Sequence, residues 1–268
     1  MTELHLEGQI KWPICDHQIA DQTISEIAAA DRCALVLFTP RSGSSWLTKI
    51  VSATLQLGFL EEYINPSFID DVAKAMDATD HATLIAMLKR RAKTTNGVFS
   101  MEARAVDIAL FGETKFFQAF GNGAVVFFLW RDDIIAQGIS LYRAVVTNRY
   151  HSTDAPTAPP EYDADKIAEW ALHVVAIENE NFALLERQGL RARFLRYEDI
   201  VRDRATTLAI FADALRVDLT EEALAARQEQ ELHKIADKWN HDAAERFLKE
   251  RREFVSELEA QRRIRRGP

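Results

Sequence analysis

Five consecutive residues, 41–45, combine a permanent cation, three hydroxyl groups and a glycine. Arg41 carries a guanidinium whose N–H donors match the oxygens of a phosphate or sulfate group. Gly43 permits the tight turn that lets backbone N–H groups approach such a ligand closely. The hydroxyl groups belong to Ser42, Ser44 and Ser45. These residue types at this spacing predict a binding site for phosphate or sulfate.

The segments on either side of this loop supply the elements that would position it. Residues 34–39 are a short apolar run, which is typical of a strand buried on both faces. Residues 46–57 have the apolar spacing of a helix. A helix that begins directly after the loop would direct its first N–H groups, and the positive end of its dipole, at the bound anion.

Neither of the common nucleotide-binding loops fits this segment. A Walker A loop needs a glycine where this chain has Phe38 and a lysine where it has Ser44. A dinucleotide fingerprint needs three spaced glycines, and only Gly43 is present. Residues 39–45 instead resemble the 5′-phosphosulfate loop of sulfotransferases, and the Thr-Pro-Arg form resembles the trehalose 2-sulfotransferase-like family of bacterial carbohydrate sulfotransferases.

A second motif follows another predicted strand, at residues 124–130. Arg131-Asp132 begins a run that resembles the same family's Arg-Asp-x-x-x-Gln-Ala-Val-Ser-x-Trp-Arg-Ala pattern. The resemblance implies that Arg131 and Ser140 bind the 3′-phosphate of the nucleotide. The alternative is that Asp132 or Asp133 caps the following helix while Arg131 is solvated, and both interpretations can hold together.

The resemblance also implies a reaction and its donor. 3′-Phosphoadenosine 5′-phosphosulfate (PAPS) would be the co-substrate and 3′-phosphoadenosine 5′-phosphate (PAP) the product. A hydroxyl of a small-molecule or carbohydrate acceptor would attack the sulfur in line. A base would take its proton while cations neutralise the leaving phosphate. Arg41 fits the second task, and the family's Gly-Arg-Pro-x-Glu-Tyr/Phe segment assigns the first to Glu62, with Glu61 as second choice.

Two positions depart from the family pattern or allow two interpretations. Glu102 stands where relatives often have lysine, in Gly-Val-Phe-Gly-x-Lys, which argues against trehalose as the acceptor. Trp46 stands where bacterial relatives often have leucine, whereas cytosolic eukaryotic sulfotransferases have a tryptophan that stacks on adenine. Trp46 either stacks in the same way or is a buried helix residue.

Composition excludes several classes of protein. The chain has 268 residues and a formal net charge of −8, which argues against a general nucleic-acid binder. No apolar run reaches the roughly 18 residues that a membrane span requires. Cys15 and Cys33 have no metal-binding or disulfide spacing, so we expect no metal and a cytoplasmic location.

The coarse architecture is α/β, a P-loop-like single domain with a central, mostly parallel sheet flanked by helices. Strands are expected at 34–39, 97–101, 124–130 and 192–197. Helices are expected at 46–57, 67–77, 80–94, 104–119, 133–149, 163–188, 204–215, 220–230 and 241–260. The strand at 192–197 is followed by Glu198-Asp199, and Tyr-Glu-Asp after a late strand recurs in the family.

We expect one sulfotransferase domain over residues 1–268. It would comprise an N-terminal extension (1–31), a family-like core (34–248), and a C-terminal helix and basic tail (249–268), with the tail solvated. Whether the chain forms a homodimer is left open. Two alternatives to a PAPS-dependent enzyme are kept: a catalytically silent protein that only binds PAP or another nucleotide, and a P-loop kinase, which would need the missing Walker lysine.

Overall fold

The computed structural model of the chain describes residues 29–121, 123–150, 154–155, 157–226 and 236–266. Cys15 and almost all of the predicted N-terminal extension lie outside these residues.

A four-stranded parallel sheet forms the centre of the fold, with strand order β2-β1-β3-β4. The strands are β1 (Arg32–Phe38), β2 (Val98–Ala103), β3 (Val125–Trp130) and β4 (Ala192–Arg196). All four predicted strands are confirmed to within two residues at each end. Because Phe38 of β1 pairs with Leu129 of β3, the carboxyl ends of these central strands meet at one edge of the sheet. Loops that follow strands there are the usual ligand-binding segments of such folds.

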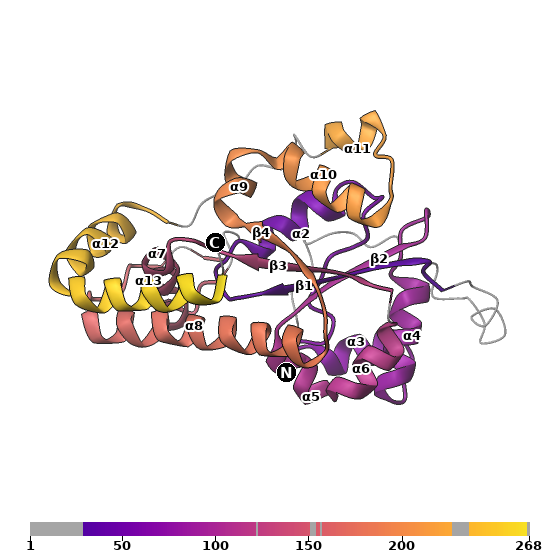
Figure 1. The fold of residues 1–268 in the computed structure, drawn as a ribbon, viewed down its shortest axis with the longest axis horizontal. Helices are drawn as coiled ribbons and strands as arrows, with labels where there is room; N and C mark the ends of the chain where they lie inside the picture. Colours follow the sequence, from indigo (N-terminus) through magenta and orange to yellow (C-terminus); the bar gives the residue numbers. More distant parts are fainter. Residues whose placement is uncertain (1–28, 122, 151–153, 156, 227–235, 267–268) are drawn as a thin grey trace.

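Helices cover both faces of the sheet and extend beyond its carboxyl edge (Figure 1). One face carries α2 (Ser44–Ser52), α9 (Tyr197–Arg202), α10 (Arg204–Leu215) and α11 (Glu221–Ala226). The other carries α3 (Ile69–Ala75), α4 (His81–Arg91), α5 (Ala105–Phe111) and α6 (Glu113–Phe120). A third group lies toward the carboxyl edge: α7 (Ile134–Thr147), α8 (Ala164–Arg187), α12 (Lys238–Glu250) and α13 (Arg252–Arg266).

The central strand β1 shows why the apolar run folds this way. Leu35 and Leu37 pack into the core on the face of α4, α5 and α6, whereas Val36 and Phe38 pack into the core beneath α2 and α10. Successive side chains point to opposite faces, so a strand covered on both sides must be apolar throughout. The predicted α/β architecture with a parallel sheet flanked by helices is therefore confirmed.

Several element boundaries predicted from the sequence are wrong. The helix expected at 104–119 is two helices, because Gly112 between them has a φ of 100°, a left-handed value that ends a helix. The helix expected at 241–260 is likewise divided, between α12 and α13 at Arg251. Helix α9 was not predicted at all, and the last part of the helix expected at 220–230 lies outside the described residues.

The C-terminal tail also differs from expectation. Arg262, expected to be solvated, is buried and forms an ion pair with Glu178 of α8. Helix α13 runs along α8 and ends close to the sheet (Figure 1). Among the helices in the described part of the chain, none is long and apolar enough to cross a membrane.

Candidate functional site

The loop from β1 to α2 is held in an unusual backbone conformation. Arg41 has a φ of 62° and Gly43 a φ of 91°, and Gly43 caps the N-terminus of α2. The loop is fixed from α7 by Gln137, whose Nε2 donates to Thr39 Oγ1 at 2.9 Å and to the Pro40 carbonyl at 2.6 Å. Gln137 belongs to the run that follows Arg131-Asp132, one position later than the glutamine of the family pattern, and the sequence alone assigns it no role. The predicted anion loop is thus a strained, braced turn that opens onto a helix N-terminus.

Arg41 points from this loop toward α7. Its Nε donates to Ser140 Oγ at 3.0 Å and its Nη1 to the Tyr150 carbonyl at 2.6 Å. Burial lowers the pKa of Arg41, and the nearby positive charge of Arg131 lowers it further. The structure therefore places Arg41 close to both Ser140 and Arg131. The positive charges of Arg41 and Arg131 repel each other, and a bound anion would relieve that repulsion.

Arg131 lies directly after β3, at the carboxyl edge of the sheet. Its guanidinium carbon is 4.7 Å from the centre of the Tyr197 ring, a cation–π contact. Asp133 caps α7, because its Oδ1 accepts from the Ala136 N–H at 2.8 Å. Capping by Asp133 is confirmed. Arg131 is half-buried against Tyr197, so the alternative of a solvated Arg131 holds only in part. The hydrogen bond of Ser140 goes to Arg41, so the Arg131–Ser140 pairing implied by their spacing stays a prediction.

The Tyr-Glu-Asp segment after β4 explains how this edge is assembled. Tyr197 packs so closely that a Cβ placed on Gly43 would lie 2.5 Å from its Cδ2. Glu198 accepts the Asp132 N–H with both carboxylate oxygens at 3.2 Å. Tyr197 thus joins the two predicted anion-binding loops, a role that the sequence motif alone did not indicate.

Two buried polar atoms in the loop region have no protein partner among the described residues. They are Ser42 Oγ and Trp46 Nε1. Ser42 is fully buried, Ser44 is buried, and Ser45 is exposed. Buried hydroxyls are almost always hydrogen-bonded, so an unsatisfied one in an anion-binding loop fits a phosphate or sulfate ligand.

Trp46 is 5% exposed and belongs to the core beneath α2. The guanidinium of Arg204 lies 5.0 Å from the centre of its ring. This burial agrees with the interpretation of Trp46 as a buried helix residue, and its stacking on adenine stays a prediction.

Three carboxylates gather beside α2, one turn after the loop. The Glu102 N–H donates to the Glu61 carbonyl at 3.0 Å. This hydrogen bond holds the segment of Glu61 and Glu62, which contains the predicted base, beside β2. Thr48 of α2 donates a short hydrogen bond to Glu102 Oε1. Burial, with the charges of Glu62 and Glu61, raises the pKa of Glu102 well above its usual value. Burial, with Glu62, raises the pKa of Glu61 to about 7.

Glu62 occupies the position between these groups and a nearby ion pair. Its Oε2 accepts from Asn65 Nδ2 at 2.7 Å. Burial raises its pKa, while Asn65 and Arg104 oppose that rise. Arg104 is itself paired with Asp107 at 2.6 Å. Carboxylates with raised pKa values are stronger bases than free ones, which suits proton abstraction near neutral pH.

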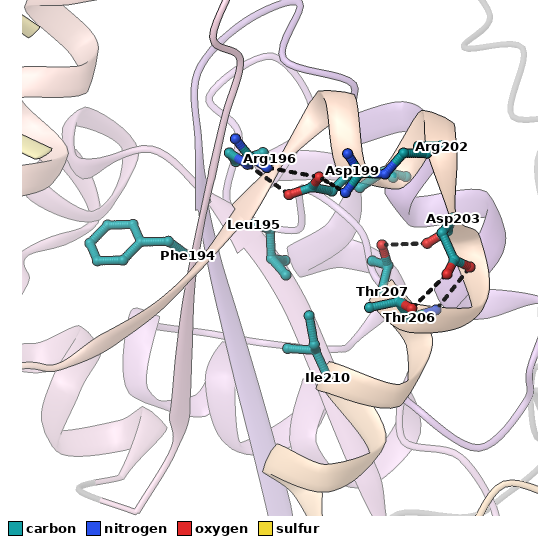
Figure 2. Close-up of a pocket in the computed structure, with 10 residues that line it drawn as sticks. Phe194, Leu195, Arg196, Asp199, Arg202, Asp203, Thr206, Thr207 and Ile210 are labelled. Atoms are coloured by element: carbon teal, nitrogen blue, oxygen red, sulfur yellow. Dashed lines mark hydrogen bonds and ion pairs between the residues drawn. The ribbon is translucent and has the colours of Figure 1, made fainter. Parts of the chain in front are cut away.

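A pocket of about 170 Å³ lies on the outer side of β4 (Figure 2). It is lined by residues of β4, α9 and α10. Asp199 pairs there with Arg196 at 2.7 Å and with Arg202 at 2.6 Å. None of the predicted site residues lines it, and Asp203 in its wall caps α10. This pocket is therefore separate from the loops described above. In the described part of the chain, no group of three or more His, Cys, Asp or Glu residues is arranged to hold a metal.

Comparison with known proteins finds one matching family and several similar solved structures. A family model described as Stf0 sulphotransferase matches residues 33–250. Sulfotransferase STF9 from Mycobacterium avium has 13% sequence identity and a TM-score of 0.50, covering 86% of this chain and 78% of its own. Sulfotransferase STF1 from Mycobacterium tuberculosis has 12% identity and a TM-score of 0.47, covering 85% and 79%. A sulfotransferase domain from the Synechococcus olefin synthase has 14% identity and a TM-score of 0.44, covering 89% and 98%. No curated protein sequence gives a significant match.

Proposed function

The chain belongs to the Stf0 sulphotransferase family, and we propose that it transfers the sulfuryl group of PAPS to a hydroxyl of a small-molecule or carbohydrate acceptor, releasing PAP. The observation that carries the proposal is the convergence of two loops, after β1 and after β3, on one cationic edge. Arg41 reaches Ser140 there, and Arg131 lies within electrostatic range of Arg41. A ligand with separate 5′ and 3′ anionic groups would satisfy both loops.

The loop after β1 would hold the 5′ end of the donor. Gly43, Ser44 and Ser45 would contribute backbone N–H groups at the start of α2, because those of Ser42 and Trp46 already donate to the Thr39 and Gly43 carbonyls. Ser42, Ser44 and Ser45 would contribute hydroxyls, which the buried Ser42 Oγ supports, and Trp46 would stack on the adenine. Arg41 would neutralise the charge that grows on the bridging oxygen as the sulfur–oxygen bond breaks. Arg131 and Ser140 would bind the 3′-phosphate. PAPS supplies the activated sulfuryl group as substrate.

Glu62 would take the proton of the acceptor hydroxyl as its oxygen bonds to sulfur. Two features support this: the raised pKa of Glu62 and its position with the half-buried Glu61 and the buried Glu102 beside α2. Glu61 stays the second choice, because its pKa is also raised. Glu102 stands buried at the position where relatives often have lysine, so trehalose is not the acceptor that we favour. The cytoplasmic location inferred from the two cysteines is part of this proposal.

The test is a transfer assay with labelled PAPS and a panel of sugars, lipids, phenols and small metabolites. PAP release that requires an acceptor, and that falls in a Glu62→Gln variant, supports the proposal. PAP binding without transfer to any acceptor would favour the catalytically silent alternative, for which the buried Glu102 at the lysine position is the motive. Transfer of a phosphoryl group from ATP would show a kinase instead.

A further inference from the structure

The last helix of the chain reaches the segment that carries Arg131. Helix α13 contributes Arg262, whose Nε donates to Glu178 Oε2 of α8 at 2.9 Å. Both side chains are nearly inaccessible, with exposed fractions of 5% and 4%. A charged pair is kept away from water in this way only when its remaining donors also find partners.

The other two nitrogens of Arg262 bind the backbone after β3. Nη2 donates to the Arg131 carbonyl at 2.6 Å, and Nη1 donates to the Asp132 carbonyl at 2.8 Å. These carbonyls are consecutive, so one planar guanidinium fixes the peptide groups on both sides of Asp132. Arginine suits this task because its donors form a rigid fork.

The same segment is held from its other side by α9. Glu198 accepts the Asp132 N–H, and the Tyr197 ring lies under the Arg131 guanidinium. Asp133 then begins α7, the helix that carries Ser140. A shift of the Arg131 peptide would therefore move the guanidinium away from Tyr197 and would tilt the start of α7.

We propose that Arg262 is a positioning residue for the 3′-phosphate of the donor: it holds the backbone of Arg131 and Asp132 so that the Arg131 side chain meets that phosphate. This inference rests on the proposed PAPS-dependent function. Arg262 acts through geometry and not through charge, because Glu178 neutralises it. Selectivity for nucleotides that carry a 3′-phosphate thereby depends on the C-terminal helix.

The variants must separate positioning from folding. Arg262→Leu alone would leave Glu178 buried without its partner, which can unfold the protein. The double variant Arg262→Leu/Glu178→Leu removes both charges, keeps the buried volume, and still removes the donors to the two carbonyls. Arg262→Lys keeps the charge and loses the fork. The matched control is Arg32→Leu, because Arg32 also donates to backbone carbonyls, those of Asn96, Leu215 and Arg216, at the opposite end of β1.

Two measurements are made on each folded variant. Calorimetric titration compares PAP with adenosine 5′-phosphate (AMP), which differs only in lacking the 3′-phosphate. We expect the double variant and Arg262→Lys to lose on the order of ten- to a hundredfold in PAP affinity, as when a group that orients a binding side chain is removed. AMP affinity should change by less than about twofold. Hydrogen exchange at residues 131–137 should become faster in these variants and stay unchanged in Arg32→Leu.

Three results would overturn the proposal. PAP affinity could be unchanged in the double variant, PAP and AMP could lose affinity equally, or exchange at 131–137 could match the wild type. If the wild-type protein binds PAP no better than AMP, the proposed function itself fails and this proposal falls with it. That result differs from the others because it is seen before any substitution is made.

Discussion

Replacing Gly43 with alanine should disrupt the contact that joins the two predicted anion-binding loops. Gly43 has a φ of 91°, a conformation that residues with a Cβ seldom adopt. The new Cβ would lie 2.5 Å from Tyr197 Cδ2 and 3.1 Å from its Cε2, well inside van der Waals contact. The same ring lies 4.7 Å from the Arg131 guanidinium carbon. A shift of the ring would change that contact, so we expect the substitution in the loop after β1 to disturb the loop after β3.

The expected cost has two parts. Holding an alanine in the left-handed region costs about 1–2 kcal/mol. Forcing a ring out of a packed position costs about another 1–3 kcal/mol. We therefore expect Gly43→Ala to lower the free energy of unfolding by about 2–5 kcal/mol, and to weaken PAP binding because Arg131 loses its support.

The assay is urea denaturation of the wild type and two alanine variants, with PAP titration of each. Gly189→Ala is the matched control: its φ is 60°, and a Cβ there would meet nothing within 4 Å. Gly189→Ala should therefore lose only the backbone part, about 1–2 kcal/mol, and should bind PAP normally.

The difference between the two variants isolates the contact with Tyr197. If Gly43→Ala costs no more than Gly189→Ala, the ring does not pack against the loop as described. A second check uses a Tyr197→Ala background, in which the Gly43→Ala cost should shrink because the clash is gone. Equal costs in both backgrounds would refute the same reasoning.

Three further predictions concern individual charges. Arg131→Ala should weaken PAPS binding by about 2–4 kcal/mol. The binding of adenosine 5′-phosphosulfate, which lacks the 3′-phosphate, should be almost unaffected. Equal losses of affinity for both ligands in a competition titration would make Arg131 a structural residue. Glu62→Gln should lower kcat by a factor on the order of 10²–10⁴ with PAP affinity nearly unchanged. Glu61→Gln should lower kcat far less. If Glu61→Gln lowers kcat more than Glu62→Gln does, the base is Glu61. Burial raises the pKa of Glu61 to about 7, whereas in the unfolded chain it is about 4.3. The protonated carboxyl therefore stabilises the fold fully below about pH 4.3, and this stabilisation is lost as pH rises through 7. The stability of Glu61→Gln relative to the wild type should rise by about 4 kcal/mol between about pH 4 and 8. A difference that stays constant with pH in denaturation curves would contradict this.

The sheet could be predicted from the sequence because each strand is a short apolar run that is covered on both faces. The two divided helices differ in this respect. Gly112 is a helix-ending signal in the sequence, so the division between α5 and α6 was predictable. Arg251, where α12 ends and α13 begins, is neither glycine nor proline, and its non-helical φ of −125° has no signal in the sequence. Helix α9 follows β4 without a linker, and it is held by contacts to a distant loop.

The candidate site was predicted as far as its motifs are local. The loop of Arg41 and the capping by Asp133 follow from consecutive residues. The bracing by Gln137, Tyr197 and Arg262 does not, because each acts on residues far away along the chain. Arg262 gave no sequence signal of its own, since it stands in a basic run that looks like a solvated terminus.

The central claim is that this edge of the sheet binds a nucleotide with both a 5′ and a 3′ phosphate group. Its most direct test is the thermal stability of the protein with PAP, AMP or ATP at equal concentrations. A ligand at a hundred times its Kd adds about 2.7 kcal/mol to the free energy of unfolding, enough for a clear rise in Tm. We predict that PAP raises the Tm by several degrees and that AMP and ATP do so much less. Equal stabilisation by PAP and ATP, or none by PAP, would contradict the account.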